Sequence, residues 1–409
     1  MTTTRNRTAA AVVLGVLGVA GAYQQARATQ APVPMKKLAA PAPKMVPNFE
    51  WDDTFPKLPF PKDWIIGTVV GVDADAKDHI WIAHRAETLN PNELELERKR
   101  GGCCIKAPHV MEFDYAGNLV QAWGGPSPTK EYDWPTAGTQ SPDPNVGGTP
   151  NGMHSIFVDS QDQVWLTGTG PGDGQILKFT RQGKFLLQFG TAAAAAGMAS
   201  RGKADSNSTE RLNAATGVAE YAPTNEIFIS DGYGNRRVAV LDRTTGKYKR
   251  HWGAFGKRPD DTTKWTYDAN SPNPQFNTPH GIAVSTDGLV YLADRNNSRL
   301  QVFKVDGTYV TEKFVENHAM SGTAFGVALS ADPAQRYVYM PDGRNEKVWI
   351  LERKSMDILG SFGCPGHAGG CFTTPHSIAT DSRGNIYIGE TWEGKRVQRF
   401  LYKGLRPQS

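Results

Sequence analysis

The chain has 409 residues and a formal net charge of +4, but this charge is unevenly distributed. Residues 1–48 contribute six positive charges and no negative one, which leaves residues 49–409 with a net charge of −2. A nearly neutral body has no electrostatic attraction for nucleic acids or for anionic membranes, so composition argues against both as partners.

The first segment is typical of an export signal. Arg5 and Arg7 precede an uncharged apolar run from residue 9 to residue 22, and Ala26-Arg27-Ala28 fits the small-x-small pattern of a cleavage site. The run is shorter than the about 20 residues that cross a membrane as a helix, although an uncleaved anchor is the alternative. We therefore expect a signal peptide at 1–28, a periplasmic or secreted protein, and no stable membrane span after cleavage.

An Ala- and Pro-rich linker is expected at 29–48, followed by a single repeat domain at 49–409. Six units each contain a small residue, a short apolar strand, a polar turn and an apolar–aromatic–apolar triplet of the kind that strands favour. The triplets are Ile80-Trp81-Ile82, Val164-Trp165-Leu166, Ile227-Phe228-Ile229, Val290-Tyr291-Leu292, Val338-Tyr339-Met340 and Ile386-Tyr387-Ile388. Four short strands per unit predict an all-β fold, a six-bladed β-propeller.

The last unit ends soon after Phe400 and is one strand short. Closing the ring removes exposed sheet edges, so we expect the stretch 49–64 to supply the missing strand. Cys364 and Cys371 lie close enough in one loop to pair, whereas the adjacent Cys103 and Cys104 have no assignable partners. No pair of cysteines shows the spacing of a zinc ribbon.

Histidine recurs at one position of the repeat. The residue before the opening small residue of each unit is, in chain order, Val70, His154, Thr216, His280, Phe325 and His376. Histidine thus occupies units two, four and six, which a sixfold ring relates by a third of a turn. Because the opening strand of a blade lines the central channel, we expect the three imidazoles to converge on the axis. Three histidines with an open fourth position form the donor set of a catalytic zinc site, whereas a lone histidine is more simply a channel residue bonded to water.

Three further polar residues follow second strands of their units. Arg85 and Arg295 suit a substrate carboxylate, which a guanidinium can grip in bidentate fashion. Tyr233 could act as an acid or a base beside a metal. Taken singly, each could equally be part of a surface ion pair or a rim aromatic.

Together these residues resemble the peptidyl-α-hydroxyglycine α-amidating lyase family of NHL-repeat propellers, from about Gly67 onward. The motifs that carry the resemblance are Gly-Met-His-Ser, Thr-Pro-His-Gly-Ile-Ala and Thr-Pro-His-Ser-Ile-Ala around the three histidines, His84-Arg85, Ser-Asp-Gly-Tyr ending at Tyr233, and Ala293-Asp294-Arg295. The resemblance implies one zinc ion held by His154, His280 and His376. It also implies catalytic roles for Tyr233, Arg85 and Arg295, with both arginines binding the substrate carboxylate.

The resemblance also implies a structural calcium ion, held in part by the backbone carbonyls of Val72 and Ile156. In the family an aspartate that helps to hold this ion follows the last zinc-binding histidine. Ser377 stands at that position here, which argues against tight calcium binding. Gly234 replaces the cysteine that follows the family's tyrosine, so the corresponding disulfide is missing.

The function that the resemblance implies is that of a zinc-dependent carbon–nitrogen lyase. It would cleave a small-molecule or peptide carbinolamide, R–CO–NH–CH(OH)–COO⁻, to an amide and glyoxylate. One alternative is a metal-dependent propeller hydrolase such as a lactonase, with carboxylate ligands. Asp231, Asp294, Asp342 and Glu390 recur at strand ends, although an acid there more simply caps a turn. The other alternative is a non-catalytic binding module, because fold alone does not decide function.

Overall fold

The computed structural model describes residues 43–135, 152–193, 202–264, 266, 268–318 and 322–408. The expected signal peptide at 1–28 and most of the expected linker at 29–48 lie outside the described residues.

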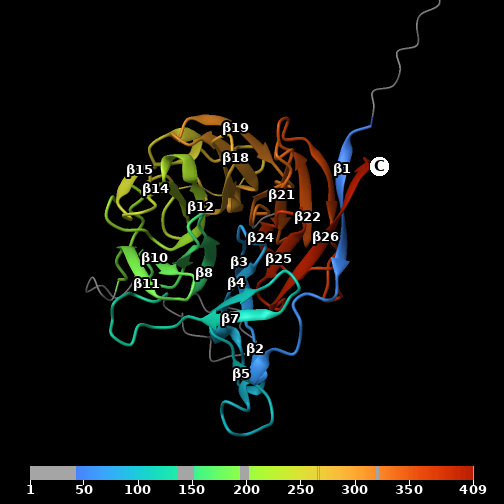
Figure 1. Cartoon of the computed structure of the whole chain (residues 1–409). Helices are drawn as coiled ribbons and strands as arrows, with labels where there is room; N and C mark the ends of the chain where they lie inside the picture. Colours follow the sequence, from blue (N-terminus) through green and yellow to red (C-terminus); the bar gives the residue numbers. More distant parts are fainter. Residues whose placement is uncertain are drawn as a thin grey trace, which may run out of the picture. The chain divides into compact units, whose positions relative to one another are not determined.

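Six four-stranded antiparallel sheets are arranged around a central axis, as Figure 1 shows. Blade 1 comprises β3 (Thr68–Ala74), β4 (Ile80–Arg85), β6 (Val110–Phe113) and β7 (Leu119–Trp123); blade 2 comprises β8 (Met153–Val158), β9 (Gln163–Gly168), β10 (Gln175–Thr180) and β11 (Phe185–Gly190); blade 3 comprises β12 (Ala215–Tyr221), β13 (Glu226–Asp231), β14 (Arg237–Asp242) and β15 (Tyr248–Trp252).

The remaining three blades have the same order of strands, except that the last one is completed from the start of the described chain. Blade 4 comprises β16 (Pro279–Val284), β17 (Leu289–Asp294), β18 (Arg299–Lys304) and β19 (Tyr309–Phe314); blade 5 comprises β20 (Ala328–Leu329), β21 (Tyr337–Asp342), β22 (Lys347–Glu352) and β23 (Ile358–Phe362); blade 6 comprises β24 (Pro375–Thr380), β25 (Ile386–Glu390), β26 (Arg396–Pro407) and β1 (Met45–Asp52). The predicted all-β, six-bladed propeller is confirmed.

Short elements lie in the connections within and between the blades. The parallel pair β2 (Trp64–Ile65) and β5 (Ile105–Lys106) forms the base of a projection from blade 1, visible at the bottom of Figure 1. The 3-10 turns are η1 (Pro61–Asp63), η2 (Ala86–Thr88), η3 (Pro91–Leu94), η4 (Ala222–Thr224), η5 (Ala254–Gly256) and η6 (Arg295–Asn297). No helix within the described ranges is long and apolar enough to cross a membrane.

The first strand of each blade is innermost. Each of these strands contacts the first strand of the next blade, in the cycle β3, β8, β12, β16, β20, β24 and back to β3. The packing is close: a Cβ atom on Gly281 of β16 would lie 2.5 Å from the Cα atom of Gly326, which precedes β20. The six inner strands enclose an axial cavity of about 340 Å³.

The ring is closed by pairing the two ends of the described chain. β1 runs antiparallel to β26, with Glu50 opposite Leu401, and Arg399 donates to Asp52 at 2.5 Å. The strand begins at Met45, inside the range that the sequence indicated as linker, because Val46 is buried against the core between blades 5 and 6. After β1 has ended at Asp52, the rest of the stretch 49–64 forms loops, η1 and the first residue of β2.

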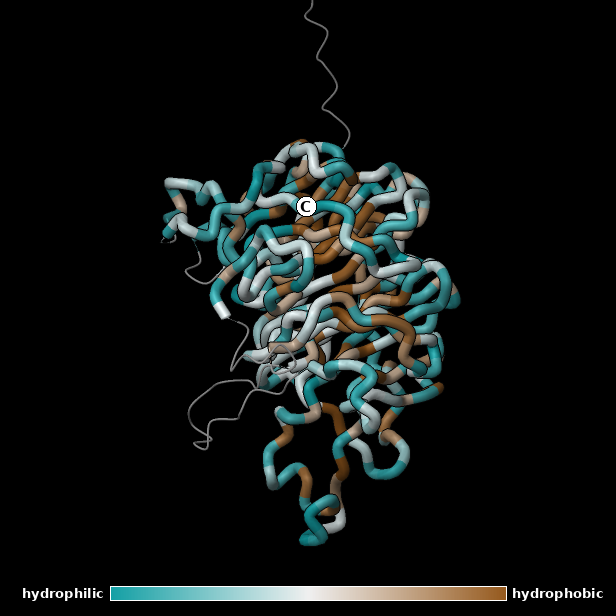
Figure 2. Tube along the Cα trace, turned by 90° about the vertical axis from the view of Figure 1, so that its left-hand side faces the viewer, coloured by the Kyte–Doolittle hydropathy of each residue, from teal (hydrophilic) through white to brown (hydrophobic). Residues whose placement is uncertain are grey.

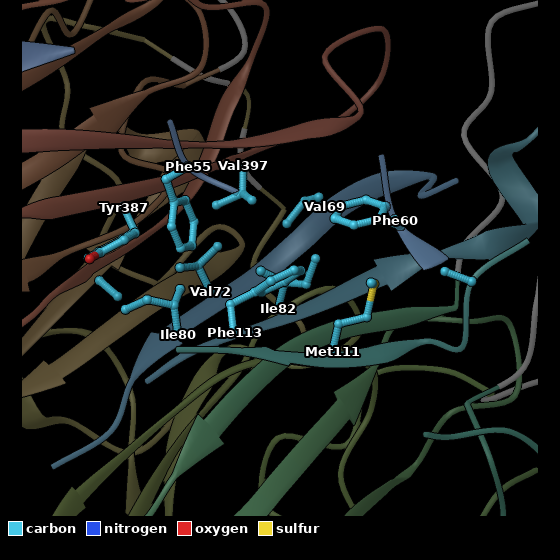
Figure 3. Packing of buried hydrophobic residues seen from close by; sticks show 12 residues of the cluster. Phe55, Phe60, Val69, Val72, Ile80, Ile82, Met111, Phe113, Tyr387 and Val397 are labelled. Carbon is cyan, nitrogen blue, oxygen red and sulfur yellow. The ribbon is translucent and has the colours of Figure 1, made fainter. Parts of the chain in front are cut away.

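The hydrophobic core is divided among the contacts between neighbouring blades. Figure 2 shows hydrophobic residues concentrated along the strands, whereas the loops are mostly hydrophilic. Between blades 6 and 1, Phe55 from the segment after β1 inserts among Val72, Ile82 and Tyr387, as Figure 3 shows. Burial of such side chains stabilises the fold by about 25 cal/mol for each Å² of apolar surface removed from water.

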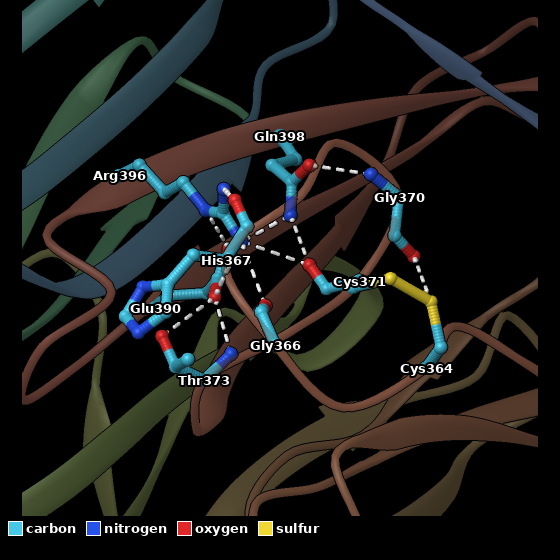
Figure 4. Close-up of a disulfide and its surroundings, with 9 residues drawn as sticks. All are labelled: Cys364, Gly366, His367, Gly370, Cys371, Thr373, Glu390, Arg396 and Gln398. Carbon is cyan, nitrogen blue, oxygen red and sulfur yellow. Dashed lines mark hydrogen bonds and ion pairs between the residues drawn. A yellow bond between two sulfur atoms is a disulfide. The ribbon is translucent and has the colours of Figure 1, made fainter.

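One disulfide links Cys364 to Cys371 in the loop between β23 and β24, as expected from their spacing (Figure 4). Arg396 and Gln398 of β26 both donate to the carbonyl oxygen of Cys371 at 2.9 Å, so this loop is held against blade 6. Cys103 and Cys104, for which the sequence indicated no partners, are joined to each other.

A buried carboxylate in blade 3 makes stability sensitive to acid. Burial raises the pKa of Glu226, but hydrogen bonds from Arg250, Lys249 and Thr224 outweigh it and lower the pKa to about 2, from an ordinary value of 4.5. Because the pKa is lower in the folded protein, the stabilisation is present above pH 4.5 and is lost as the pH falls towards 2. We expect Glu226→Gln to reduce the loss of stability between pH 4.5 and pH 2, measured as the free energy of urea unfolding against pH. The same loss of stability in the variant and the parent protein would contradict this role of Glu226.

Candidate metal centre

Three inner strands bring His154, His280 and His376 together. The ring centroids lie 4.8 Å apart for His154 and His280, 4.9 Å for His154 and His376, and 4.8 Å for His280 and His376. One ring nitrogen from each histidine lies within 4.8 Å of the others. All three side chains are buried, so the nearly equilateral triangle is a preformed set of donors on the axis.

Each imidazole is oriented by the blade that follows it. Nδ1 of His154 bonds to the carbonyl oxygen of Thr216 at 2.8 Å, Nδ1 of His280 to that of Phe325, and Nδ1 of His376 to that of Val70 at 2.9 Å. A carbonyl only accepts, so Nδ1 must carry the proton and Nε2 must present its lone pair. Nε2 of His154 and His280 is buried without any hydrogen-bond partner, which fits a metal ligand.

These orienting carbonyls belong to the residues that alternate with the histidines at the same repeat position. Val70, Thr216 and Phe325 align there in the sequence, but nothing in the sequence indicates their role. The repeat position is the only feature that these residues share in the sequence, because a residue of any type supplies the same backbone carbonyl.

The surroundings keep the three rings neutral. Burial lowers the pKa of His376 to about 3, and the positive charges of Arg295 and Arg85 act in the same direction. Burial, reinforced by the neighbouring rings, also lowers the pKa of His154 and of His280 well below the ordinary value. Neutral imidazole is the form that binds metal.

A hydroxyl network connects Thr216, whose carbonyl orients His154, to the backbone around His280. Thr216 Oγ1 donates to the carbonyl oxygen of Pro279 at 2.7 Å, and Ser230 Oγ donates to that of His280 at 2.6 Å.

We expect Thr216→Val to lower zinc affinity about tenfold, because supporting residues of this kind commonly contribute that much. Competition with a zinc-binding dye measures the change. Thr311→Val on β19 is the matched control, and equal affinities of the two variants would contradict a role for this network.

The predicted arginines and tyrosine lie on the face where the inner strands begin. In the register of blades 1 and 4, Arg85 pairs with Thr68, and Asp294, directly before Arg295, pairs with Pro279. The Tyr233 ring centroid is 5.3 Å from that of His154 and 5.9 Å from that of His280. The structure therefore brings Tyr233 directly over two of the histidines.

Among the described residues, each arginine uses only some of its N–H groups in hydrogen bonds to the protein. Arg85 Nε donates to the carbonyl oxygen of Met153 at 2.8 Å, and its Nη2 donates to Thr169 Oγ1 at 3.2 Å. Arg295 Nη1 donates to Tyr233 Oη at 2.8 Å, while its Nε is buried without a hydrogen-bond partner. The Arg295 guanidinium lies 4.0 Å from the ring centroid of Phe325, the residue whose carbonyl orients His280.

The recurrent strand-end acids are turned away from the axis. Nε of Arg237 donates to Asp231 at 2.8 Å, Nε of Arg299 to Asp294 at 2.8 Å, and Nε of Arg396 to Glu390 at 2.6 Å. Asp342 instead accepts from Trp349 Nε1 at 2.9 Å. Each acid therefore joins the second strand of its blade to the third, and none belongs to the metal-binding cluster on the axis.

A second cluster with metal-ligating side chains occurs in blade 1, at the turn after β3. Asp75, His79 and Glu112 offer ligand atoms within 4.8 Å of one another. The guanidinium of Arg181 bonds to Asp75 at 2.7 Å and also to Glu112. A cation is thus already present among these carboxylates, and the cluster is an ion-pair network.

Comparison with known proteins agrees with this architecture. A family model described as NHL repeat matches residues 276–303, which cover β16, β17 and most of β18. The chain is 25% identical over 367 residues to peptidyl-alpha-hydroxyglycine alpha-amidating lyase 1 of Drosophila melanogaster, covering 84% of this chain. It is 27% identical over 362 residues to peptidylglycine alpha-amidating monooxygenase of Rattus norvegicus, covering 83% of this chain. The chain is a six-bladed propeller with a match to the NHL repeat, and over most of its length it is similar to these amidating enzymes.

This NHL-repeat propeller spans 59% of the length of the Drosophila relative and 32% of that of the rat relative. Among solved structures, a streptogramin B lyase aligns with a TM-score of 0.46 at 12% identity, over 87% of this chain and 88% of that chain.

Val72 and Ile156 lie further along the axial cavity of the NHL propeller, on β3 and β8. Ser377, which stands where the family that the sequence resembles has a calcium-holding aspartate, has a buried hydroxyl without a hydrogen-bond partner among the described residues. The expectation that the carbonyls of Val72 and Ile156 do not bind calcium tightly stays a prediction.

Proposed function

We propose that the chain is a zinc-dependent lyase that cleaves a carbinolamide to an amide and glyoxylate. The observation that carries this proposal is the triangle of buried imidazoles with all three Nδ1 atoms tied to carbonyls. His154, His280 and His376 would hold the ion, and the Tyr233 ring lies beside two of these ligands. Zinc bound there would supply Lewis acidity and lower the pKa of the substrate hydroxyl.

The arginines would bind the substrate carboxylate. Arg295 has its Nη1 on Tyr233 and its Nε unpartnered, so the Nε–Nη2 edge is available for a bidentate contact. Arg85 uses Nε and Nη2 within the protein, which leaves Nη1 for the same carboxylate. The two guanidinium groups would also offset the negative charge that develops as the carbon–nitrogen bond breaks.

Tyr233 would move the proton. As the carbon–nitrogen bond of the substrate breaks, its electron pair passes to nitrogen and the hydroxyl oxygen forms the carbonyl of glyoxylate. Tyr233 Oη would take the hydroxyl proton and deliver its own proton to the departing nitrogen, so that the amide leaves neutral. The hydrogen bond from Arg295 Nη1 orients the phenol for this relay.

Export is the second part of the proposal. The Cys364–Cys371 disulfide is of the kind that persists in oxidising compartments, and it agrees with the apolar segment near the start of the sequence. We infer that the chain acts outside the cytoplasm on small-molecule or peptide substrates that reach it there.

The test is product analysis with zinc-loaded protein and N-benzoyl-α-hydroxyglycine. We expect benzamide and glyoxylate in equal amounts, and Tyr233→Phe should slow their release at least about a hundredfold, as expected for loss of an acid–base group. Benzoate in place of benzamide would indicate a hydrolase, and no product at all would favour a binding module.

A further inference from the structure

A third arginine lies on the same face, between the metal centre and solvent. Arg344 follows the end of β21, where Ala324 bridges to Asp342 and the amide of Phe325 donates to the carbonyl oxygen of Pro341. Phe325 is the blade 5 residue at the histidine position, so the β21 end lies level with the three imidazoles. Arg344 therefore stands two residues beyond that level, on the side that carries Arg295.

The backbone before Arg344 is packed on the centre itself. A Cβ atom on Gly343 would lie 2.8 Å from the Phe325 ring, so only glycine allows this approach. The same ring also contacts the Arg295 guanidinium, which lies 4.0 Å from the ring centroid. The Phe325 ring centroid is also 5.9 Å from that of His376. Arg344 is thus connected to the centre through one aromatic ring.

The Arg344 side chain is exposed and has no anionic partner of its own. Asp342, the acid that acts on Arg344 electrostatically, already accepts hydrogen bonds from Asn345 and from Trp349 Nε1, at 2.8 and 2.9 Å. Within the described ranges, no ion pair or side-chain hydrogen bond involves the Arg344 guanidinium. Partial burial and the like charge of Arg295 lower the pKa of Arg344 and outweigh the opposing attraction of Asp342, so the two cations share one region of the face.

Trp392 holds this guanidinium in place. It lies two residues beyond Glu390, which pairs with Pro375 next to His376, so it occupies the matching position on blade 6. The Arg344 guanidinium is 5.6 Å from the Trp392 ring centroid. Stacking on an aromatic ring restrains an arginine while leaving its N–H edge free to bind an anion.

We propose that Arg344 and Trp392 form a second anion subsite, which selects substrates whose acyl group R carries a carboxylate. This inference rests on the proposed function, in which Arg85 and Arg295 hold the hydroxyglycine carboxylate and R points away from the axis. The hydroxyglycine carboxylate would occupy those two arginines, so Arg344 would bind a second carboxylate on the same substrate. The expected substrate class is therefore N-acyl-α-hydroxyglycines with an acidic acyl group, such as a succinyl group or an acidic peptide residue.

Equilibrium binding to zinc-loaded protein tests the subsite without depending on turnover. Calorimetry would compare N-succinylglycine with N-acetylglycine, which lack the reactive hydroxyl. We expect the succinyl compound to bind about tenfold more tightly, since a hydrogen bond to a charged group contributes about that factor. Arg344→Gln should reduce the preference to near unity, and Trp392→Ala should reduce it in part.

Arg383→Gln is the matched control. Arg383 is an exposed arginine stacked 3.7 Å from the ring centroid of Tyr115, in the turn between β24 and β25 on the opposite face. Arg383→Gln changes the net charge by the same amount as Arg344→Gln, and it should leave the preference for the succinyl compound intact. Equal affinities in the parent protein, no binding of either compound, or a preference that survives Arg344→Gln would overturn the subsite. Glyoxylate release from N-acetyl-α-hydroxyglycine, measured in parallel, reports separately on the proposed function.

Discussion

Replacing His280 with alanine is expected to remove zinc and to reduce glyoxylate release to background. His280 contributes one corner of the triangle, and its Nε2 is buried without another partner. Changes to residues that merely support a ligand cost about 10–100-fold in affinity, so loss of a ligand should cost at least about a thousandfold. Metal analysis after dialysis, together with product analysis, measures both effects.

The control for this prediction is His367→Ala, because His367 is an exposed histidine in the disulfide loop and does not belong to the axial histidine cluster. Circular dichroism and urea unfolding would establish that His280→Ala is folded. Zinc bound as tightly to the folded His280→Ala variant as to the parent protein would rule out the three-histidine centre.

The second large effect concerns stability. Arg299 and Asp294 form a fully buried ion pair at 2.8 Å, and both side chains have 0% exposure. Arg299→Met would leave the Asp294 carboxylate buried with only neutral hydrogen-bond donors. Removing one partner of such a pair costs about 3–5 kcal/mol, because the remaining charge is uncompensated. Urea unfolding should show this loss as a lower midpoint with an unchanged slope.

Two further variants sharpen this test. Arg336→Met removes an exposed arginine whose i,i+4 partner is Asp332, and it should cost less than about 1 kcal/mol. The double variant Asp294→Asn/Arg299→Met should be less destabilised than the sum of its single changes, because the two residues interact directly. A cost for Arg299→Met as small as that for Arg336→Met would contradict a stabilising role for the pair.

The ring and the histidine triangle could be predicted from the sequence because both follow from repetition. Six aligned units placed His154, His280 and His376 at one repeat position in alternate units, and ring geometry then required convergence on the axis. The same alignment held the orienting residues Val70 and Phe325. Their role was not predictable, because it lies in carbonyl oxygens that depend on how neighbouring blades approach.

The role of the strand-end acids could not be predicted from the sequence of one unit. Asp294 could be a metal ligand or a structural group, and the difference depends on the direction of its side chain. A signal was present: an arginine follows five or six residues later in three of the four units, at the start of the third strand. The pairing of second with third strands places these groups side by side.

Two other features depended on tertiary contacts. The closing strand begins at Met45 because Val46 reaches the core between blades 5 and 6, whereas the local Ala and Pro content indicated a linker. Arg344 and Trp392 belong to no motif, since their units share neither residue with the others. Only their matching places beyond β21 and β25 bring them together.

The most direct measurement of the central claim is anomalous diffraction at the zinc absorption edge, from crystals of the zinc-loaded protein. We expect one peak per chain on the propeller axis, about 2.0–2.1 Å from Nε2 of His154, His280 and His376. A peak elsewhere, or none on the axis of protein that has been offered zinc, would contradict the metal centre and the lyase mechanism built on it.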